Sequence, residues 1–189
     1  DSVKHGFALS EASNTPVMLD LRLRSCHLQG SFIAEDNVRP PMTVTDAVEN
    51  PQRDLSRIVL PPASFLHEQE KINARWPAAV EYIRTNQMNE FFDGADGVDD
   101  IGIIVQGGLY NTLNRSLELL GCSDAFGNTQ VPMYVMNVTY PVVDEEVLEF
   151  CAGKKAVLLL EEGQPDYIEQ NLHSILRKAG VTTALHGKD

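Results

Sequence analysis

The chain has 189 residues, of which 43% are hydrophobic and 22% are charged, and its formal net charge is −12. This size suits one globular domain, or one domain with part of another, and no apolar run approaches the roughly 20 residues that cross a bilayer. The negative charge disfavours nucleic acids and anionic membranes as partners, and because no signal-peptide pattern opens the chain, we expect a cytoplasmic protein.

The first residues predict a helix followed by a strand. Val3, Phe7 and Ala8 recur at helical spacing within residues 2–13. The stretch "TPVMLDLRLR", residues 15–24, then alternates apolar residues with others, which predicts a strand. A single helix and strand are too small to fold alone. We therefore expect them to be the end of another domain in a longer protein.

A long connector and a second helical region follow. Residues 25–62 hold five prolines and no sustained periodicity, which is typical of a surface connector. Helical periodicity returns over residues 63–92, where Pro77 should kink or restart the helix. The acidic "DGADGVDD" then lacks the glutamate that a calcium loop needs at its twelfth position, where a loop that begins at Asp93 has Ile104, so we interpret it as a solvated turn.

Residues 100–180 repeat one strand and one helix three times. The units pair 101–105 with 109–120, 132–138 with 145–151, and 156–160 with 166–178. Apolar strands alternating with amphipathic helices predict a parallel sheet that is covered on both faces. The fold class expected is therefore α/β, as a three-layer Rossmann-like parallel sheet.

Ligands of such sheets bind beyond the carboxyl ends of the strands, where the turns read "QGGLYN", "TYPVVD" and "EEGQPD". Gly107 and Gly108 would admit an anion to a helix start, but the spacing departs from G-x-G-x-x-G, so a tight turn is favoured. In the second turn, Asp144 is the expected helix cap. In the third, Glu161 and Glu162 should point to opposite sides, which favours one of them at an interface.

The best catalytic candidate is the "RSCH" stretch at the predicted strand end, with Arg24 and His27 as its charged and titratable members. The alternative is that a single histidine is only structural. The three cysteines, Cys26, Cys122 and Cys151, lie far apart and predict no disulfide framework or metal site. No G-x-S-x-G or H-E-x-x-H motif occurs.

Five motifs in order resemble one known family: "TPVMLDLRLRSCH", "IGIIVQGGLYNTLNRSLELLG", "VPMYVMNVTYP", "VLLLEEGQPDYIEQNL" and "HGKD". The chain resembles, from about Val3 to its end, the alpha subunit of indolepyruvate ferredoxin oxidoreductase, a thiamine-diphosphate-dependent 2-oxoacid:acceptor oxidoreductase. The resemblance implies a remnant of the pyrimidine-binding domain at residues 1–27, a linker and helical connector at 28–99, and a transketolase-C-terminal-like domain at 100–189.

The resemblance also implies a function for the whole enzyme. That enzyme would decarboxylate a 2-oxo acid and pass electrons to ferredoxin, using thiamine diphosphate, Mg and iron–sulfur clusters, none of which we expect in this fragment. Arg24 and His27 match the family's R-x-x-H at the edge of the active site. The implied partners are the other domains, a second subunit, ferredoxin and the 2-oxo acid, in a homo-oligomer.

The implied role of this part is domain placement and subunit association, without catalysis by the fragment alone. A stand-alone flavodoxin-like module, binding a nucleotide or flavin at Gly107 and Gly108, is the alternative hypothesis. A regulatory or scaffolding module without any ligand is a third.

Overall fold

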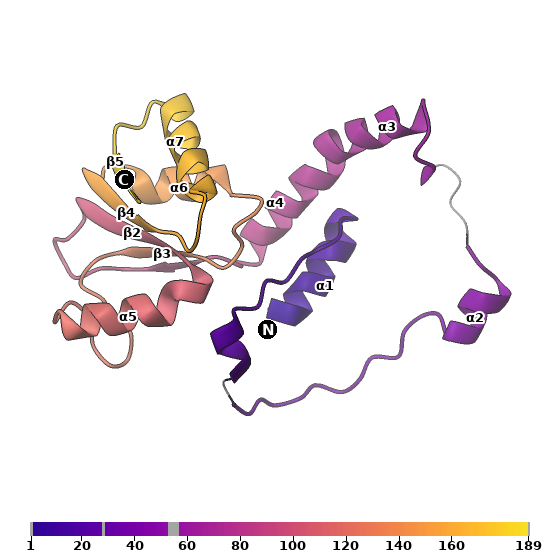
Figure 1. The fold of residues 1–189 in the computed structure, drawn as a ribbon, viewed down its shortest axis with the longest axis horizontal. Coiled ribbons are helices and arrows are strands. Elements are labelled where there is room, and N and C mark those ends of the chain that lie inside the picture. Colours follow the sequence, from indigo (N-terminus) through magenta and orange to yellow (C-terminus); the bar gives the residue numbers. More distant parts are fainter. Residues whose placement is uncertain (1, 28, 53–56, 189) are drawn as a thin grey trace.

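A computed structural model describes residues 2–27, 29–52 and 57–188, with an α/β body at one end and helices beside it (Figure 1). The body is a five-stranded sheet in the order β1-β3-β2-β4-β5. Its strands are β1 (Glu90–Phe92), β2 (Ile101–Gln106), β3 (Met133–Met136), β4 (Ala156–Leu160) and β5 (Ala184–His186). β2, β3, β4 and β5 pair in parallel, and β1 joins β3 in antiparallel fashion.

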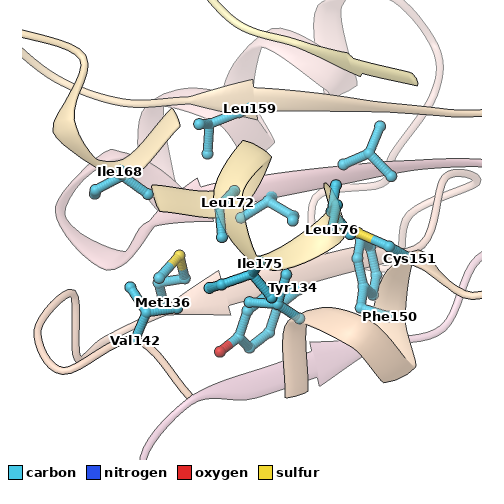
Figure 2. Packing of buried hydrophobic residues seen from close by; sticks show 13 residues of the cluster. Tyr134, Met136, Val142, Phe150, Cys151, Leu159, Ile168, Leu172, Ile175 and Leu176 are labelled. Atoms are coloured by element: carbon cyan, nitrogen blue, oxygen red, sulfur yellow. The ribbon is translucent and has the colours of Figure 1, made fainter. Parts of the chain in front are cut away.

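Helices cover both faces of the sheet, which confirms the predicted three-layer α/β fold. A short 3-10 turn, η4 (Gly107–Leu109), leads from β2 into α5 (Tyr110–Leu119) on one face. The other face carries α6 (Asp144–Cys151) and α7 (Tyr167–Ala179), whose apolar side chains meet the sheet in the larger core cluster (Figure 2). All three predicted strand–helix units are present, with ends shifted by a few residues.

The predicted helical spacing identifies the buried positions of α7. Ile168, Leu172 and Leu176 are 7%, 0% and 4% exposed and pack in this cluster. Cys151 lies in the same core, where burial raises the pKa of its thiol to about 11. It is therefore a thiol of the core.

Two edge strands were not predicted. β1 falls inside the region assigned to a helix, because the end of that region, "EFF", is apolar but only three residues long. β5 falls in the closing "TTALHGKD", which shows no strand pattern of its own. Both strands exist because a neighbouring strand, β3 or β4, offers backbone hydrogen bonds.

The helix at residues 2–13 is confirmed as α1 (Ser2–Ser13), although its buried side differs from the predicted one. Leu9 is buried against α4 (Trp76–Thr85) and Val143, whereas Phe7 is 74% exposed.

The strand predicted at residues 15–24 is wrong. Residues 16–22 have no regular secondary structure, and Leu23–His27 form the 3-10 turn η1. Alternating apolar residues favour a strand only where another strand lies alongside, and no described strand pairs with this segment.

The connector is exposed and carries one short helix, α2 (Val44–Glu49), which begins at a capping box between Thr43 and Asp46. The second helical region is α3 (Ala63–Glu70), a π-helical turn η3 (Lys71–Arg75) and then α4. Pro77 stands at the start of α4, so the π turn lies where the missing N–H and the proline ring disturb the helix. No helix of the described residues is long and apolar enough to span a bilayer.

Candidate functional site

The strand order places the candidate site at the carboxyl ends of β2 and β4. The chain passes from β2 to β3 on one side and from β3 across to β4 on the other. In doubly wound sheets such a reversal marks the position between two strand ends where ligands bind. Here that position, which we call the switch-point crevice, lies between residues 106–108 after β2 and residues 161–162 after β4.

A side chain from the amino-terminal segment occupies this crevice. Arg22 Nη1 donates to the carbonyl oxygen of Gly108 at 2.9 Å, and Nε donates to Glu162 Oε1 at 3.0 Å. Arg22 Nη2 lies 2.8 Å from the same carboxylate oxygen, with the two side chains 27% and 46% exposed. The guanidinium therefore contacts both borders of the crevice. Gly108 is 86 positions and Glu162 is 140 positions away from Arg22 in the sequence.

The polar groups of the crevice suit a cation rather than a phosphate. Its borders present the Glu162 carboxylate and the Gly108 carbonyl oxygen, both acceptors, to the guanidinium. A phosphate would meet the carboxylate at close range, which is unfavourable. Gly107 cannot carry a side chain without displacing Asn137, because a Cβ there would overlap that amide. The glycine pair thus serves a tight turn and close packing, the favoured interpretation of the sequence.

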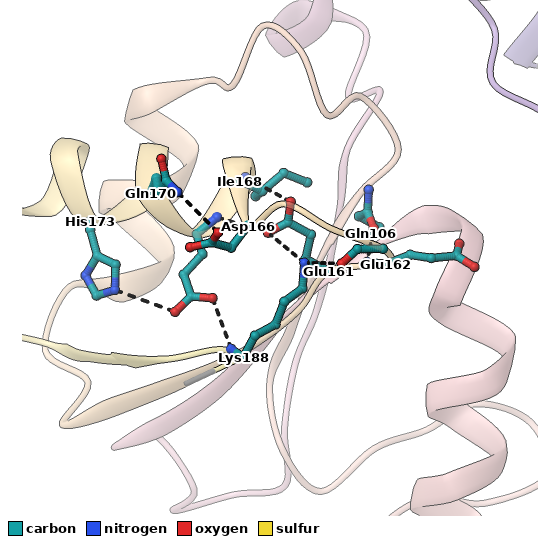
Figure 3. A network of polar contacts seen from close by, with 10 residues as sticks. Gln106, Glu161, Glu162, Asp166, Ile168, Gln170, His173 and Lys188 are labelled. Atoms are coloured by element: carbon teal, nitrogen blue, oxygen red, sulfur yellow. Dashed lines mark hydrogen bonds and ion pairs between the residues drawn. The ribbon is translucent and has the colours of Figure 1, made fainter.

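The two adjacent glutamates diverge, as the strand geometry predicts (Figure 3). Glu162 meets Arg22, while its own N–H donates to Gln106 Oε1 at 2.5 Å. Glu161 turns toward α7, where its two carboxylate oxygens accept from the N–H groups of Ile168 at 3.0 Å and Glu169 at 3.2 Å. Glu161 therefore caps the amino end of α7, and the two carboxylates share no proton.

The closing residues of the chain pack against the same helix. Lys188 Nζ donates to the Gly163 carbonyl at 2.6 Å and lies 3.8 Å from Glu161 Oε2. The Lys188 N–H donates to Glu169 Oε2 at 3.0 Å, and the Glu169 side chain is 4% exposed. This Lys188 network joins the carboxyl end of the chain to the turn that follows β4.

Of the two predicted catalytic residues, the structure describes only the side chain of His27. His27 is exposed at the end of η1, and its side chain makes no hydrogen bond or ion pair with the described residues. Arg24 belongs to the same turn, but its side chain lies outside the described part of the structure. The arginine whose described side chain lies in the crevice is Arg22.

The predicted capping role of Asp144 is wrong. Val143 occupies the N-cap of α6, and no side chain caps this helix. Glu146, an acidic residue in the first turn of α6, is buried at 8% exposure and accepts from Tyr134 Oη at 2.7 Å and Asn89 Nδ2 at 2.8 Å. Burial and this hydrogen bond raise the pKa of Tyr134.

The described residues do not fit the cofactors that the family resemblance implies. They contain no group of three His, Cys, Asp or Glu side chains placed to hold a metal ion. A four-cysteine iron–sulfur site needs more cysteines than the chain has, since it holds three. The crevice itself presents acceptors where a diphosphate needs donors.

Sequence reasoning missed Arg22 and Gln106 as crevice residues. The sequence did contain an indication for Arg22. An arginine among the apolar residues of a predicted strand needs an acidic partner if its side chain is buried in the folded protein. One of Glu161 and Glu162 was expected at an interface, without a choice between them. What the sequence did not reveal was that these two positions meet.

No family model matches the chain. The curated proteins it resembles are called indolepyruvate oxidoreductase subunit IorA. The protein from Methanothermobacter thermautotrophicus is 26% identical over 186 residues, which cover 98% of this chain and 28% of the relative. Those from Pyrococcus abyssi and Pyrococcus horikoshii are 25% and 22% identical over 197 and 194 residues, covering 100% of this chain and 28% of each relative.

The chain thus spans little more than a quarter of the length of these relatives, at 28%. The match extends over the helices, the connector and the α/β body alike, because it covers 98% of the chain or more. The family resemblance of the sequence motifs is confirmed, and the chain is related along nearly its whole length to a segment of the indolepyruvate oxidoreductase subunit IorA.

Proposed function

We propose that the chain is part of a thiamine-diphosphate-dependent 2-oxoacid:ferredoxin oxidoreductase of the indolepyruvate type, in which it places neighbouring domains and subunits. The names of its relatives support an oxidoreductase subunit, and the chain's limited share of their length supports a part rather than the whole. In this proposal the fragment has no catalytic activity alone. Catalysis, the metal-bound coenzyme and the iron–sulfur clusters belong to the rest of the enzyme.

The observation that carries this proposal is the Arg22 contact in the switch-point crevice. The position where a related fold would hold a coenzyme instead holds a guanidinium from the amino-terminal segment, bonded to Glu162 and Gly108. A half-exposed ion pair contributes only about 0–1 kcal/mol, so it fixes geometry more than stability. The crevice therefore acts as a docking point between two parts of the chain.

The division of the chain into three parts is included in the proposal. Residues 1–27 would end the pyrimidine-binding domain, residues 28–99 would form a linker and helical connector, and residues 100–189 would form the transketolase-C-terminal-like domain. The strand β1 belongs to the second part in sequence but pairs with β3 in the sheet of the third. The exposed apolar side chains of the first part support this division, since Met18 is 93% and Leu21 is 66% exposed. Apolar surface of this extent is typical of an interface with further protein.

The partners of the whole enzyme follow from the same proposal. They are its other domains and a second subunit, with ferredoxin as acceptor and a 2-oxo acid as substrate, in a cytoplasmic homo-oligomer. Arg24 and His27 would lie at the edge of the active site formed with those domains. Exposure of His27 in this chain is compatible with that position.

Titration of two coenzymes into the 189-residue chain tests the proposal against the flavodoxin-like alternative. We expect calorimetry to show no submicromolar binding of thiamine diphosphate or of flavin mononucleotide, because the crevice offers acceptors and is filled by Arg22. Submicromolar thiamine diphosphate binding would contradict the proposal. Flavin binding that is lost in Gly108→Val and kept in Gly30→Val would instead establish the alternative, since Gly30 has no atom within 4 Å of an added Cβ.

A further inference from the structure

A second cavity lies away from the crevice, at the β1 edge of the sheet. It has a volume of about 610 Å³ and lies between the end of α4, β1 and α6. Its charged lining consists of Glu81, Arg84, Glu90, Glu146 and Glu149, and Phe91 is one of its two aromatic residues. Nothing in the proposed function uses these residues, so the inference below does not depend on that function.

The buried charged residue of this lining is a carboxylate that pairs with no described cation. Glu146 is 8% exposed, and its Oε2 accepts from Tyr134 Oη and Asn89 Nδ2. No described residue donates to its Oε1, and no described basic side chain pairs with it. Oε1 is not one of the buried side-chain atoms that lack a partner, so it is accessible from the cavity. An accessible carboxylate oxygen on a largely buried side chain is a place where a positively charged group can make a charge-assisted hydrogen bond.

The rest of the lining adds to the negative potential. Four of its side chains are carboxylates, and Arg84 is the basic one among them. The Arg84 guanidinium already lies 3.9 Å from Glu81 at the exposed rim of the cavity. A concave surface with this balance concentrates cations and repels anions.

The strand beside the cavity has a free edge. β1 is terminal in the sheet, so on its outer side no described strand pairs with it. Phe91, in the middle of β1, is 48% exposed and stacks on Tyr134 with ring centroids 4.7 Å apart. An extended segment can add to such an edge, and an exposed aromatic ring next to carboxylates attracts a guanidinium.

We propose that the Glu146 cavity receives an arginine side chain, carried on an extended segment of a partner polypeptide that lies along β1. Arginine fits better than lysine because its planar group can donate to the one open oxygen of Glu146 while it stacks on the exposed ring of Phe91. The segment's backbone bonds to the edge of β1, and its guanidinium bonds to Glu146 Oε1. This surface is separate from the Arg22 crevice on the other side of β3.

A pair of blocked peptides tests this inference on the isotope-labelled 189-residue chain by nuclear magnetic resonance. One peptide has a central arginine between β-branched residues, and the other replaces that arginine with citrulline, which has nearly the same shape but no charge. We expect the arginine peptide to shift the amide signals of β1 and α6, and the citrulline peptide to bind about tenfold more weakly. Added salt should weaken the binding of the arginine peptide and leave the binding of the citrulline peptide unchanged.

Two isosteric variants locate the interaction. Glu146→Gln should weaken binding of the arginine peptide about tenfold. Glu145→Gln, on the neighbouring exposed residue outside the cavity, should leave binding unchanged. If Glu146→Gln does not fold, as judged by its amide spectrum, Glu149→Gln and the citrulline peptide carry the test. Equal binding of both peptides, shifts confined to other surfaces, or no shift at millimolar peptide would overturn the inference.

Discussion

Leu172→Ala is expected to lower the free energy of unfolding by about 2–5 kcal/mol. Leu172 is 0% exposed at the centre of α7 and packs in the larger core cluster on the α6 and α7 face of the sheet (Figure 2). Removing its branched end takes apolar contacts from neighbours on several elements and leaves a cavity that this close-packed core fills only in part. Urea unfolding followed by circular dichroism measures the change.

Leu119→Ala is the matched control for this change. Leu119 is also a helical leucine, in α5, but it is 73% exposed. Its replacement should change the unfolding free energy by no more than about 0.5 kcal/mol. If both variants lost the same stability, the described core would not be the one that holds the fold together.

Gly187→Ala is expected to cost about 3 kcal/mol, because it combines overpacking with the loss of a charge-assisted hydrogen bond. A Cβ at Gly187 would overlap the carboxylate of Glu169, which is 3% exposed and cannot easily move away. Moving that carboxylate would also break its hydrogen bond from the Lys188 N–H. Thermal unfolding and hydrogen exchange of the α7 amides measure the effect, which should extend to the carboxyl end of the chain.

Gly30→Ala is the control for the second prediction. Gly30 has open space around the position of a Cβ and no left-handed backbone, so the added methyl should be nearly neutral. A Gly187→Ala protein as stable as Gly30→Ala would show that the last residues do not pack on Glu169 as described.

The three central strands and their helices are predictable from sequence because the residues that each one buries recur at a regular spacing. In α7, for example, Ile168, Leu172 and Leu176 follow helical spacing, and all three are buried. β1 and β5 escape prediction because three residues are too few to show a period, and they become strands only through pairing with β3 and β4. The segment at 15–24 shows the opposite error, since it has the strand pattern without a described strand beside it.

The contacts of the site are less predictable than the fold. That Glu161 and Glu162 point apart follows from strand geometry, but the partner of Glu162 lies 140 positions away. Glu146 had the features of a first-turn helix charge, and only the packing of α6 on the sheet shows that it is buried beside Tyr134. Local patterns identify which residues are buried or capped, whereas pairing between distant charges depends on the tertiary arrangement.

The central claim, that the switch-point crevice docks Arg22 rather than a coenzyme, is tested most directly by a through-space contact in solution. An added Cβ at Gly108 would lie 3.5 Å from Arg22 Cδ, so the Hα protons of Gly108 must be close to the Hδ protons of Arg22. A nuclear Overhauser cross-peak between them, weakened in Glu162→Gln, is the predicted result. An assigned spectrum without that cross-peak would contradict the account.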